Sequence, residues 1–376
     1  MAIASSNRPS VLVVGGYGVV GTQATRLLAE RNPGIDLLVG GRDAERADAL
    51  ARELPSARGV VVDLTDADPL HRLPHAIDAV LCAANDPDDR LLRACVRHGT
   101  ALIDITRWSA RVRDGLARLP AERAPRAPVV FASSWMAAVP ATLAVSAARA
   151  MASVSRIEMD VLYALADRAG PDSTAYMDQL GTAFAVTEQG RPAMRPPLSD
   201  PKRVDFDGGR RVRTRLFDTP DLMTLPATTG AATVKTRIAF DDALATGGLA
   251  FLVRSGIWSL IDGERFTPLR RRLLYAPGEG DHHRVRVSIA GRSADGSEIA
   301  GRIDIDDPAG QTHLTATGAA VQVERVLGLH GHARAAAGAQ YAEAVTDAAP
   351  LLAALDASGI RVAGDGLPAD APAAAV

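Results

Sequence analysis

The stretch VLVVGGYGVVG, residues 11–21, decides the fold expected of this 376-residue chain. Four β-prone residues run directly into a glycine-rich turn, and a helical pattern opens directly after the turn. In such a turn Gly16 allows the tight bend, Gly18 lets the backbone approach a pyrophosphate, and Gly21 lets the helix pack against the strand. The free N–H groups of the helix N-terminus then face the phosphates. The stretch therefore predicts a dinucleotide-binding turn, and the alternative is an ordinary strand–helix turn.

The sequence around this turn alternates short β-branched runs with alanine- and leucine-rich helical stretches as far as about residue 150. This alternation is typical of βαβ units that build a parallel sheet. It predicts an α/β fold with a Rossmann-type, doubly wound parallel sheet of six strands. The expected strands are 11–14, 35–39, 60–62, 79–81, 101–103 and 128–131.

From about residue 155 the hydrophobic pattern changes to a period of two, as in Ile157, Met159 and Val161. Strands of this kind have one apolar and one wet face, so we expect an inserted second α/β domain on a mixed, largely antiparallel sheet. The segment 191–211 is rich in Pro, Arg and Asp, which indicates a solvated loop or, less favoured, a lid. The expected domains are 1–140 with 316–376, which contain the glycine-rich turn, and 141–315, which contain the second sheet.

The end of the second predicted strand determines the choice of dinucleotide. An NAD site has an acidic residue there that accepts a hydrogen bond from the ribose 2′-hydroxyl. Here the strand ends at Gly41 and Arg42, and the first acid is Asp43. An arginine at this position can hold a 2′-phosphate by paired hydrogen bonds. The sequence therefore favours NADP over NAD, and the alternative is that Arg42 is a surface residue at a helix start.

Further cofactor contacts are expected at the ends of the later strands. Asp63 is placed to contact the adenine edge, and small residues after the fourth strand allow the chain to pass the ribose and pyrophosphate. After the fifth strand, Asp104 and Thr106 are expected to approach the nicotinamide. For Asp63 and Asp104 the alternative is a helix cap or a turn carboxylate. The residues assigned to the cofactor are Gly16, Tyr17, Gly18, Val19, Val20, Gly21, Gly41, Arg42, Asp63, Leu64, Ala83, Ala84, Asn85 and Thr106.

Composition excludes several other functions. A net charge of -2 argues against a general nucleic-acid binder, and no stretch is long and apolar enough to predict a membrane span. The chain has two lysines, Lys202 and Lys235. Neither directly follows a glycine, which excludes a GxxxxGK phosphate loop, and neither lies four residues after a tyrosine, which excludes a Tyr-x-x-x-Lys pair.

Two cysteines, with no signal peptide, indicate a cytoplasmic protein. His282 and His283 are adjacent and lack a third ligand, so we expect no metal site.

With these features, the chain resembles the saccharopine dehydrogenase-like family of NADP-dependent oxidoreductases. The resemblance rests on VVGGYGVVG (13–21), LLVGGRD (37–43), VVDLTD (61–66), VLCAAN (80–85), ALIDIT (101–106), RVRVSIAG (284–291) and SGIRV (358–362). It implies a Rossmann-type domain completed by C-terminal helices and interrupted by a domain that binds the second substrate and often mediates dimerisation. It also implies that NADPH delivers hydride to an imine of a small molecule, or the reverse, in a homodimer.

The chemistry expected of such a site requires orientation of the substrate and a proton source. Asp104 and Trp135 are candidates to hold a cationic substrate, and Tyr176 is a candidate proton donor. The alternatives are interdomain packing for Trp135 and a buried structural hydroxyl for Tyr176. Two other functions stay open, namely enoyl reduction of a lipid or polyketide-like substrate and a non-catalytic NADP-sensing regulator.

Overall fold

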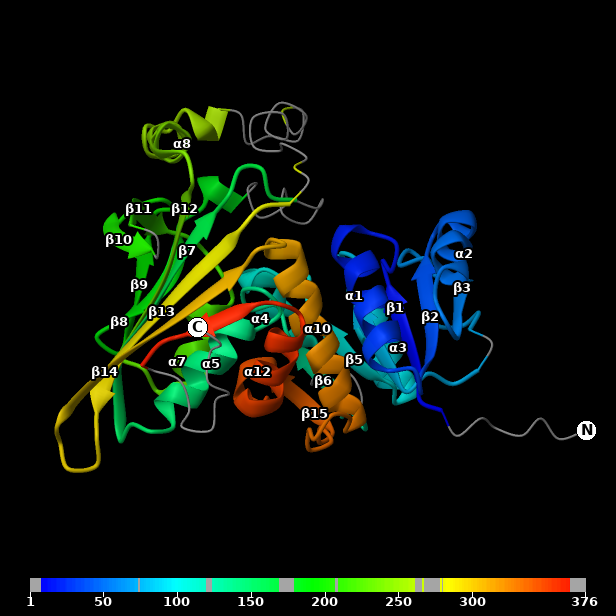
Figure 1. Cartoon of the computed structure of the whole chain (residues 1–376). Coiled ribbons are helices and arrows are strands. Elements are labelled where there is room, and N and C mark those ends of the chain that lie inside the picture. The colour runs from blue at the N-terminus through cyan, green and yellow to red at the C-terminus, as the bar shows by residue number, and fades with distance from the viewer. Residues whose placement is uncertain are drawn as a thin grey trace, which may run out of the picture. The chain divides into compact units, whose positions relative to one another are not determined.

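The computed structural model describes residues 8–73, 75–119, 124–168, 179–206, 209–260, 266, 278 and 280–365. These residues form two compact units (Figure 1). Unit 1 holds the described residues up to Ala132 together with Ala319–Tyr341, and unit 2 holds Ser133–Gly318 and the residues from Ala342 on. The C-terminal residues from Ala342 on thus group with unit 2, whereas the sequence assigned them to the first domain. The assignment of dinucleotide binding to the first expected domain, and of substrate binding and dimerisation to the second, stays a prediction.

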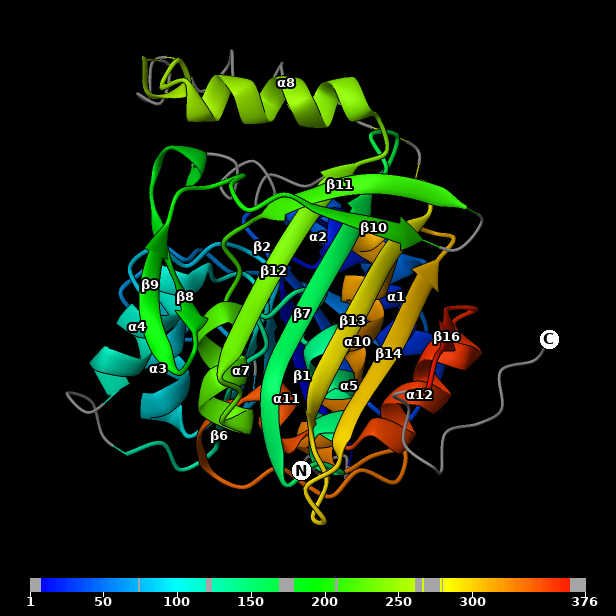
Figure 2. The same ribbon diagram turned by 90° about the vertical axis from the view of Figure 1, so that its left-hand side faces the viewer.

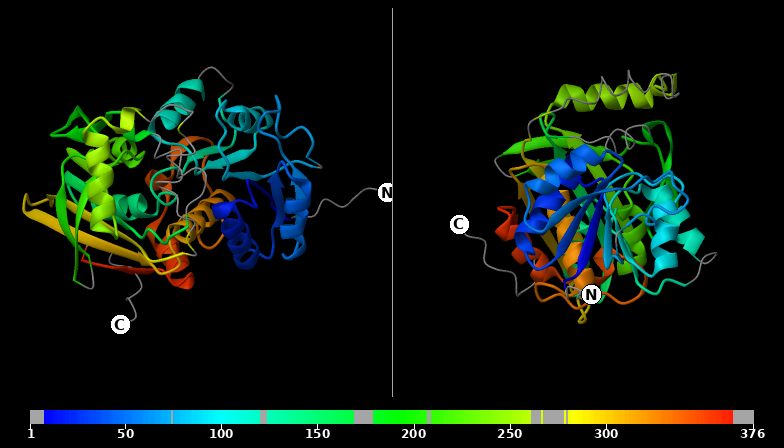
Figure 3. Two further views of the ribbon diagram at one scale, coloured as in Figure 1. Left: turned by 90° about the horizontal axis from the view of Figure 1, so that it is seen from above. Right: turned by 90° about the vertical axis from the view of Figure 1, so that its right-hand side faces the viewer.

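Unit 1 is a seven-stranded parallel sheet with helices on both faces (Figures 1 and 3). Its strands are β1 (Ser10–Val14), β2 (Asp36–Gly41), β3 (Ala57–Val61), β4 (Ala79–Cys82), β5 (Ala101–Asp104), β6 (Pro128–Phe131) and β15 (Gly338–Tyr341). Its helices are α1 (Val19–Arg31), α2 (Ala44–Arg52), α3 (Arg90–His98), α4 (Ser109–Arg118) and the later part of α10 (Gln311–Leu327). The predicted doubly wound parallel sheet is confirmed.

The strand order explains where a ligand can bind in unit 1. The order β15-β6-β5-β4-β1-β2-β3 reverses direction between β1 and β4. In doubly wound sheets the crevice at this reversal, beyond the carboxyl ends of the strands, is the usual ligand site. Leu12 and Val13 at the centre of β1 have no exposed surface, as expected of a strand covered on both faces. The glycine-rich turn follows β1 and therefore lies at this reversal.

The seventh strand of this sheet is one that the sequence did not predict. β15 pairs in parallel with β6, with Gly338 opposite Pro128 and Tyr341 opposite Phe131. Its sequence GAQY contains no β-branched residue, and all four residues remain partly or fully accessible. An edge strand with one neighbour needs no apolar run, so periodicity could not reveal it.

Unit 2 is built on a nine-stranded mixed sheet (Figure 2). Its strands are β7 (Ser153–Tyr163), β8 (Phe184–Glu188), β9 (Arg191–Arg195), β10 (Lys202–Phe206), β11 (Arg210–Leu216), β12 (Thr233–Phe240), β13 (His283–Arg292), β14 (Glu298–Asp307) and β16 (Arg361–Ala363). Its helices are α5 (Val139–Ala148), α7 (Asp221–Thr229), α8 (Ala243–Arg254), α11 (Ala342–Val345) and α12 (Ala348–Ala357), with short 3-10 helices at Gln179–Gly181 and Trp258–Leu260.

The sheet of unit 2 has one apolar and one polar face, as the period of two predicted. Of its strand pairs, β7 and β12 run parallel and the others run antiparallel. On β7, Ile157, Met159 and Val161 are buried hydrophobic residues, and β7 and β13 contact α5. Nine of the ten residues of α5 are buried, which fits a helix that is apolar on all sides. The predicted mixed, largely antiparallel second sheet is confirmed.

The prediction of a solvated loop over 191–211 is wrong. The segment contains β9, β10 and the start of β11, and β10 pairs antiparallel with β11. In β10 the buried Val204 and Phe206 alternate with the exposed Arg203 and Asp205. The charged residues that suggested a loop occupy the wet face of a hairpin, where they cost little, and the apolar residues pack on Leu162.

The C-terminal part of unit 1 is held by a buried carboxylate on α10. Glu324 has no exposed surface, and its two oxygens accept hydrogen bonds from Arg31 Nε and Nη2 at 2.8 and 2.9 Å. Asn32 Nδ2 donates to the same carboxylate at 3.0 Å. α10 therefore secures the C-terminal end of α1, where a fork of two hydrogen bonds fixes the arginine.

We predict that Glu324→Ala lowers the free energy of unfolding by about 3 kcal/mol, because it leaves the partly buried guanidinium of Arg31 and the buried amide of Asn32 unpaired. Glu53→Ala removes an exposed ion pair with Arg26 on the same helix α1 and serves as the control, with a change below about 1 kcal/mol. Chemical denaturation measures both. Equal effects of the two substitutions would contradict the role of Glu324.

Candidate functional site

The glycine-rich turn between β1 and α1 has the geometry that a dinucleotide requires. Gly15 has φ +77°, and its N–H donates to Gly40 O at 2.9 Å. The residue of the turn with a positive φ is thus Gly15, one position before Gly16, to which the sequence assigned the tight bend. A Cβ on Gly21 would lie 2.0 Å from Gly15 O, so a side chain there has no room. Gly21 therefore packs α1 directly onto the turn, as expected of the third glycine.

The N-terminus of α1 is left open for an anion. Gly18 is its N-cap, no side chain caps it, and its first turn contains no acidic residue. The first helical hydrogen bond runs from Thr22 N to Gly18 O, so the N–H groups of Val19, Val20 and Gly21 precede the ladder. These donors and the helix dipole fit a pyrophosphate.

Tyr17 and the end of β2 form the neighbouring part of the site. A Cβ on Gly41 would lie 2.3 Å from the Tyr17 ring, so the ring lies directly on this glycine. The Tyr17 hydroxyl accepts a hydrogen bond from Asp43 N at 2.9 Å. Arg46 lies over the ring with its Cζ 4.6 Å from the centroid, and its Nη2 donates to Tyr17 O at 3.2 Å. Arg42 is exposed at the same strand end.

Arg46 is a residue that the sequence reasoning missed. It lies in the first turn of α2, whose N-cap Asp43 accepts from Arg46 N at 3.1 Å. The sequence GRDAER (residues 41–46) could have indicated it. An aspartate that caps a helix accepts a hydrogen bond from the residue three positions later, which places Arg46 at the start of α2. Arg42 and Arg46 thus place two guanidinium groups near the end of β2, the strand end that faces the ribose 2′ position in dinucleotide sites of this fold.

The other predicted cofactor residues lie at the carboxyl ends of β3, β4 and β5. Ala83 N donates to Val14 O at 2.9 Å, and a Cβ on Gly15 would lie 2.8 Å from Ala83 O. Ala83 therefore borders the glycine turn, followed by the half-buried Ala84 and the exposed Asn85. Beyond β3, Asp63 uses Oδ1 to accept from Thr65 N and Oγ1, and these two hydrogen bonds lower its pKa. Leu64, next to it, is half-buried.

Asp104 is engaged in a buried ion pair at the end of β5. Its Oδ1 accepts from Thr106 N and Oγ1, both at 2.9 Å, and its Oδ2 accepts from Arg107 Nε at 2.6 Å. Arg107 in turn donates to Asp89 Oδ1 at 2.6 Å, as does Arg111 at 2.7 Å. These geometries correspond to the alternative role of a turn carboxylate. The carboxylate of Asp104 fixes the loop after β5, and Thr106 is held through it.

In unit 2, the polar and aromatic surroundings of Trp135 form a second cluster. The half-buried Trp135 donates from its backbone N to Asp221 Oδ2 at 2.9 Å and from Nε1 to His283 Nε2 at 3.4 Å. Its ring meets Phe217 edge-on at 5.7 Å between centroids. Burial lowers the pKa of His283 to about 3, so its ring is neutral at neutral pH and can accept the indole hydrogen bond.

The chain directly after Trp135 has an unusual backbone. Met136, Ala137 and Ala138 have φ of 50°, 51° and 68°, in the left-handed region that side chains disfavour. A non-glycine residue in this region costs of order 1 kcal/mol, and such residues concentrate at functional sites. This strained run precedes the rigid, buried α5 and fixes the position of Trp135. The third catalytic candidate, Tyr176, lies outside the described residues.

Two buried carboxyl groups lie near Trp135 within unit 2. Burial raises the pKa of Asp221 to about 6 and that of Glu343 to about 7. Ser134 Oγ lies 3.3 Å from both Glu343 Oε1 and Thr224 Oγ1 and connects the group to α7. Each acid therefore keeps its proton to a higher pH than an exposed carboxyl group does.

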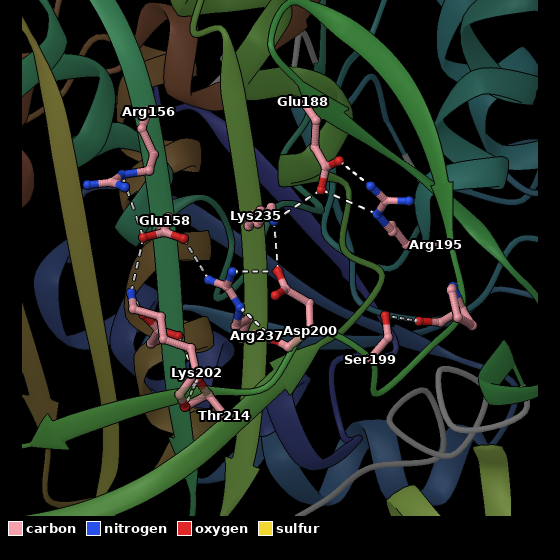
Figure 4. A network of polar contacts seen from close by, with 12 residues as sticks. Arg156, Glu158, Glu188, Arg195, Ser199, Asp200, Lys202, Thr214, Lys235 and Arg237 are labelled. Carbon is pink, nitrogen blue, oxygen red and sulfur yellow. Dashed lines mark hydrogen bonds and ion pairs between the residues drawn. The ribbon is translucent and has the colours of Figure 1, made fainter. Parts of the chain in front are cut away.

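A separate polar network lies on the sheet of unit 2 and contains both lysines of the chain (Figure 4). Lys202 Nζ lies 2.7 Å from Asp160 Oδ2, and Lys235 Nζ lies 2.7 Å from Asp200 Oδ2. Hydrogen bonds to Asp200 and Glu188 more than offset burial and raise the pKa of Lys235. Paired, charged lysines are poor nucleophiles, so neither is a candidate to form a covalent imine.

Two classes of function receive no support from the described residues. Among them, no helix combines the length and the hydrophobicity that crossing a bilayer demands. In the same part of the chain, no group of three or more His, Cys, Asp or Glu side chains is arranged to hold a metal ion.

The fold and the glycine turn define a protein with a dinucleotide-binding α/β domain. Residues 11–130 match the family model of the saccharopine dehydrogenase NADP binding domain. These residues therefore belong to that family of NADP-binding domains, which confirms the resemblance seen in the sequence. A comparison with curated protein sequences finds no match.

One solved structure shares the fold over most of the chain, and two others are less similar. Saccharopine dehydrogenase (L-Glu forming) from Saccharomyces cerevisiae is 16% identical with a TM-score of 0.66, covering 95% of this chain and 99% of that chain. A myo-inositol dehydrogenase from Corynebacterium glutamicum is 10% identical with a TM-score of 0.41, covering 85% and 88%. The WlbA dehydrogenase from Chromobacterium violaceum is 13% identical with a TM-score of 0.41, covering 98% and 100%. The family of the N-terminal domain supports an oxidoreductase that uses NADP.

We predict that Gly21→Ala abolishes detectable dinucleotide binding, because its Cβ would force α1 away from Gly15 O. Gly34→Ala is the matched control, since a Cβ on Gly34 meets nothing within 4 Å. Calorimetric titration with NADPH measures binding, and circular dichroism verifies that both variants are folded. Unchanged binding by a folded Gly21→Ala protein would contradict the assigned site.

We also predict that Glu343→Gln stabilises the protein at high pH. The carboxyl has an ordinary pKa of 4.5 and a pKa of about 7 in the fold, so the wild-type protein loses stability as the pH rises through this window. The shift corresponds to about 3 kcal/mol as an order of magnitude. Gln mimics the protonated acid, and the gain over wild type should therefore grow from pH 4.5 to pH 8. The exposed Glu298→Gln is the control, and a pH-independent difference for Glu343→Gln would contradict the raised pKa.

Proposed function

We propose that this protein is an NADPH-dependent oxidoreductase that transfers hydride to or from the C=N bond of a small molecule. The observation that carries the proposal is the uncapped N-terminus of α1 beside a strand end with two arginines. The first feature suits a pyrophosphate and the second suits a 2′-phosphate. The family of the N-terminal domain supports the same cofactor.

The proposed preference for NADP over NAD rests on the groups at the end of β2. An NAD site needs a carboxylate free to accept from the ribose 2′-hydroxyl. The nearest acid, Asp43, uses Oδ1 to cap α2. In contrast, Arg42 is exposed, and Arg46 lies on the Tyr17 ring, whose other edge contacts Gly41. This combination offers charge-assisted hydrogen bonds to a phosphate and an aromatic surface beside it.

The proposed reaction requires little acid–base chemistry from the chain. NADPH, when bound, supplies the hydride. An iminium carbon accepts hydride without proton transfer to nitrogen, so a substrate needs to be oriented and kept from water. We assign to Trp135 the role of holding the cationic group by its ring face, supported by the strained backbone that fixes it. Its Nε1 is already satisfied by His283.

The roles of the other candidates follow from their contacts. Asp104 holds Arg107 and Thr106, so we propose that it positions the loop after β5 rather than binding the substrate directly. Tyr176 stays a predicted proton donor. A small-molecule substrate, a cytoplasmic location and a homodimer also belong to this proposal, without a role for nucleic acid or a resident metal.

We predict that Arg42→Ala and Arg46→Ala each weaken NADPH binding by about tenfold or more and leave NADH binding within about twofold, because only NADPH carries the 2′-phosphate. Arg52→Ala, an exposed arginine in the last turn of the same helix, is the control and should change neither affinity. Fluorescence titration with both cofactors measures the effect. Equal losses for NADPH and NADH would show that the arginines do not read the 2′-phosphate.

Turnover with a panel of preformed imines and NADPH tests the reaction itself. Oxidation of NADPH with at least one imine, and none with the matched enoyl compounds, is the expected outcome. Oxidation with enoyl compounds alone would replace the proposal by enoyl reduction. Tight NADPH binding with no turnover on either panel would favour the non-catalytic sensor.

A further inference from the structure

A pocket of unit 1 lies at the amino ends of the parallel strands, away from the glycine turn. Its volume is about 520 Å³, within the range of small-molecule sites. It is lined by the residues directly before β4, β5, β6 and β15, namely Asp78, Thr100, Ala127 and Ala337. Because the strands are parallel, this edge is opposite to the edge that bears the dinucleotide site. Nothing in the proposed reaction uses the pocket.

Two arginines of the pocket have uncommitted guanidinium groups. Arg126 and Arg334 both line it and are exposed, and neither forms an ion pair or a hydrogen bond with any residue that the structure describes. Two histidines also line the pocket, with His98 Nε2 2.8 Å from Asp68 Oδ2 and His75 Nε2 2.9 Å from Ser10 Oγ. The arginines therefore carry the unsatisfied positive charge here.

The acidic residue of the lining does not neutralise these arginines. Asp78 Oδ2 accepts a hydrogen bond from Ser10 N at 2.8 Å, which ties this carboxylate to the start of β1. It makes no ion pair with Arg126 or Arg334 among the contacts of the described residues. The carboxylate of Asp78 is already hydrogen-bonded, whereas the two guanidinium groups are unpaired among the described residues, so these three side chains together attract an anion.

The positions of Arg126 and Arg334 near helix ends have an alternative explanation that involves no ligand. A Cβ on Gly99, the C-cap of α3, would lie 3.5 Å from Arg126 Nη2, and one on Gly328, after α10, would lie 3.2 Å from Arg334 Cβ. Cations are favoured near the carbonyl ends of helices. Neither guanidinium, however, donates a hydrogen bond to a carbonyl of the described residues, so the N–H donors of both remain available to a ligand.

Part of the pocket lining is apolar. It includes the buried hydrophobic residues Leu70, Ile77 and Val326. An inorganic ion would leave this surface uncovered, whereas an organic anion would cover it and place its charge between the arginines. We propose that this pocket binds a small organic dianion, a phosphate monoester or a dicarboxylate, held by Arg126 and Arg334. The two classes share the charge and the paired acceptor oxygens that guanidinium groups recognise.

This site is independent of the proposed redox function. It involves none of the residues of the glycine turn or of the β2 end, and it would be filled with or without bound NADPH. The probes are phenyl phosphate, for the monoester, and glutarate, for the dicarboxylate. Because Arg42 would attract a phosphate as well, the titrations use the full chain with Arg42→Ala, and NADPH binding by the wild-type chain is measured separately.

Calorimetric titration of the two probes tests the proposal. We expect one of them to bind, and we expect Arg126→Gln/Arg334→Gln to weaken that binding by at least about tenfold. Arg58→Gln, an exposed arginine on β3 at the far edge of the same sheet, is the matched control and should leave it unchanged. Ala76→Glu adds a negative charge to the exposed lining without removing an arginine and should also weaken binding.

The outcomes separate the ligand classes and the failure of the proposal. Binding of phenyl phosphate alone identifies a monoester site, and binding of glutarate alone identifies a dicarboxylate site. The absence of binding heat with both probes overturns the proposal. An unchanged affinity in both the folded Arg126→Gln/Arg334→Gln variant and the folded Ala76→Glu variant also overturns it. If the wild-type chain does not bind NADPH, the proposed redox function is refuted, but the binding of the two probes to the pocket is a separate result and is unaffected.

Discussion

The close approach of α1 to the end of β1 is the constraint on which unit 1 depends. Gly21 lies so near the carbonyl of Gly15 that no side chain fits between them. This contact brings an uncapped helix N-terminus to the reversal point of the sheet, where three backbone N–H groups have no helical partner. Unsatisfied donors of this kind are retained where a ligand completes them.

Charged groups elsewhere in the molecule are mostly committed to the fold. Asp104 and Asp89 pair with Arg107 and Arg111 in unit 1, and Glu324 joins α10 to α1. In unit 2 both lysines are paired with carboxylates. Arg42, in contrast, is exposed directly after β2, and Arg46 is stacked on Tyr17, the residue before the N-cap of α1.

The sequence predicted those parts of the molecule in which neighbouring residues determine the structure. The glycine turn, the six apolar strands and the arginine at the end of β2 all follow from local patterns. The partners of Trp135 did not, because Asp221 and His283 are brought in by the tertiary fold from 86 and 148 residues away. Arg191–Arg195 and Lys202–Phe206 were mistaken for a loop, since their charged residues outweigh an apolar alternation that only pairing reveals.

The central claim is that the open N-terminus of α1 and the arginines after β2 bind a phosphorylated dinucleotide. Isothermal titration of the purified wild-type chain with NADPH and with NADH tests it most directly. The account predicts one-site binding of NADPH with an affinity at least about tenfold above that of NADH. Absence of binding heat with both cofactors, measured at two temperatures, would contradict it.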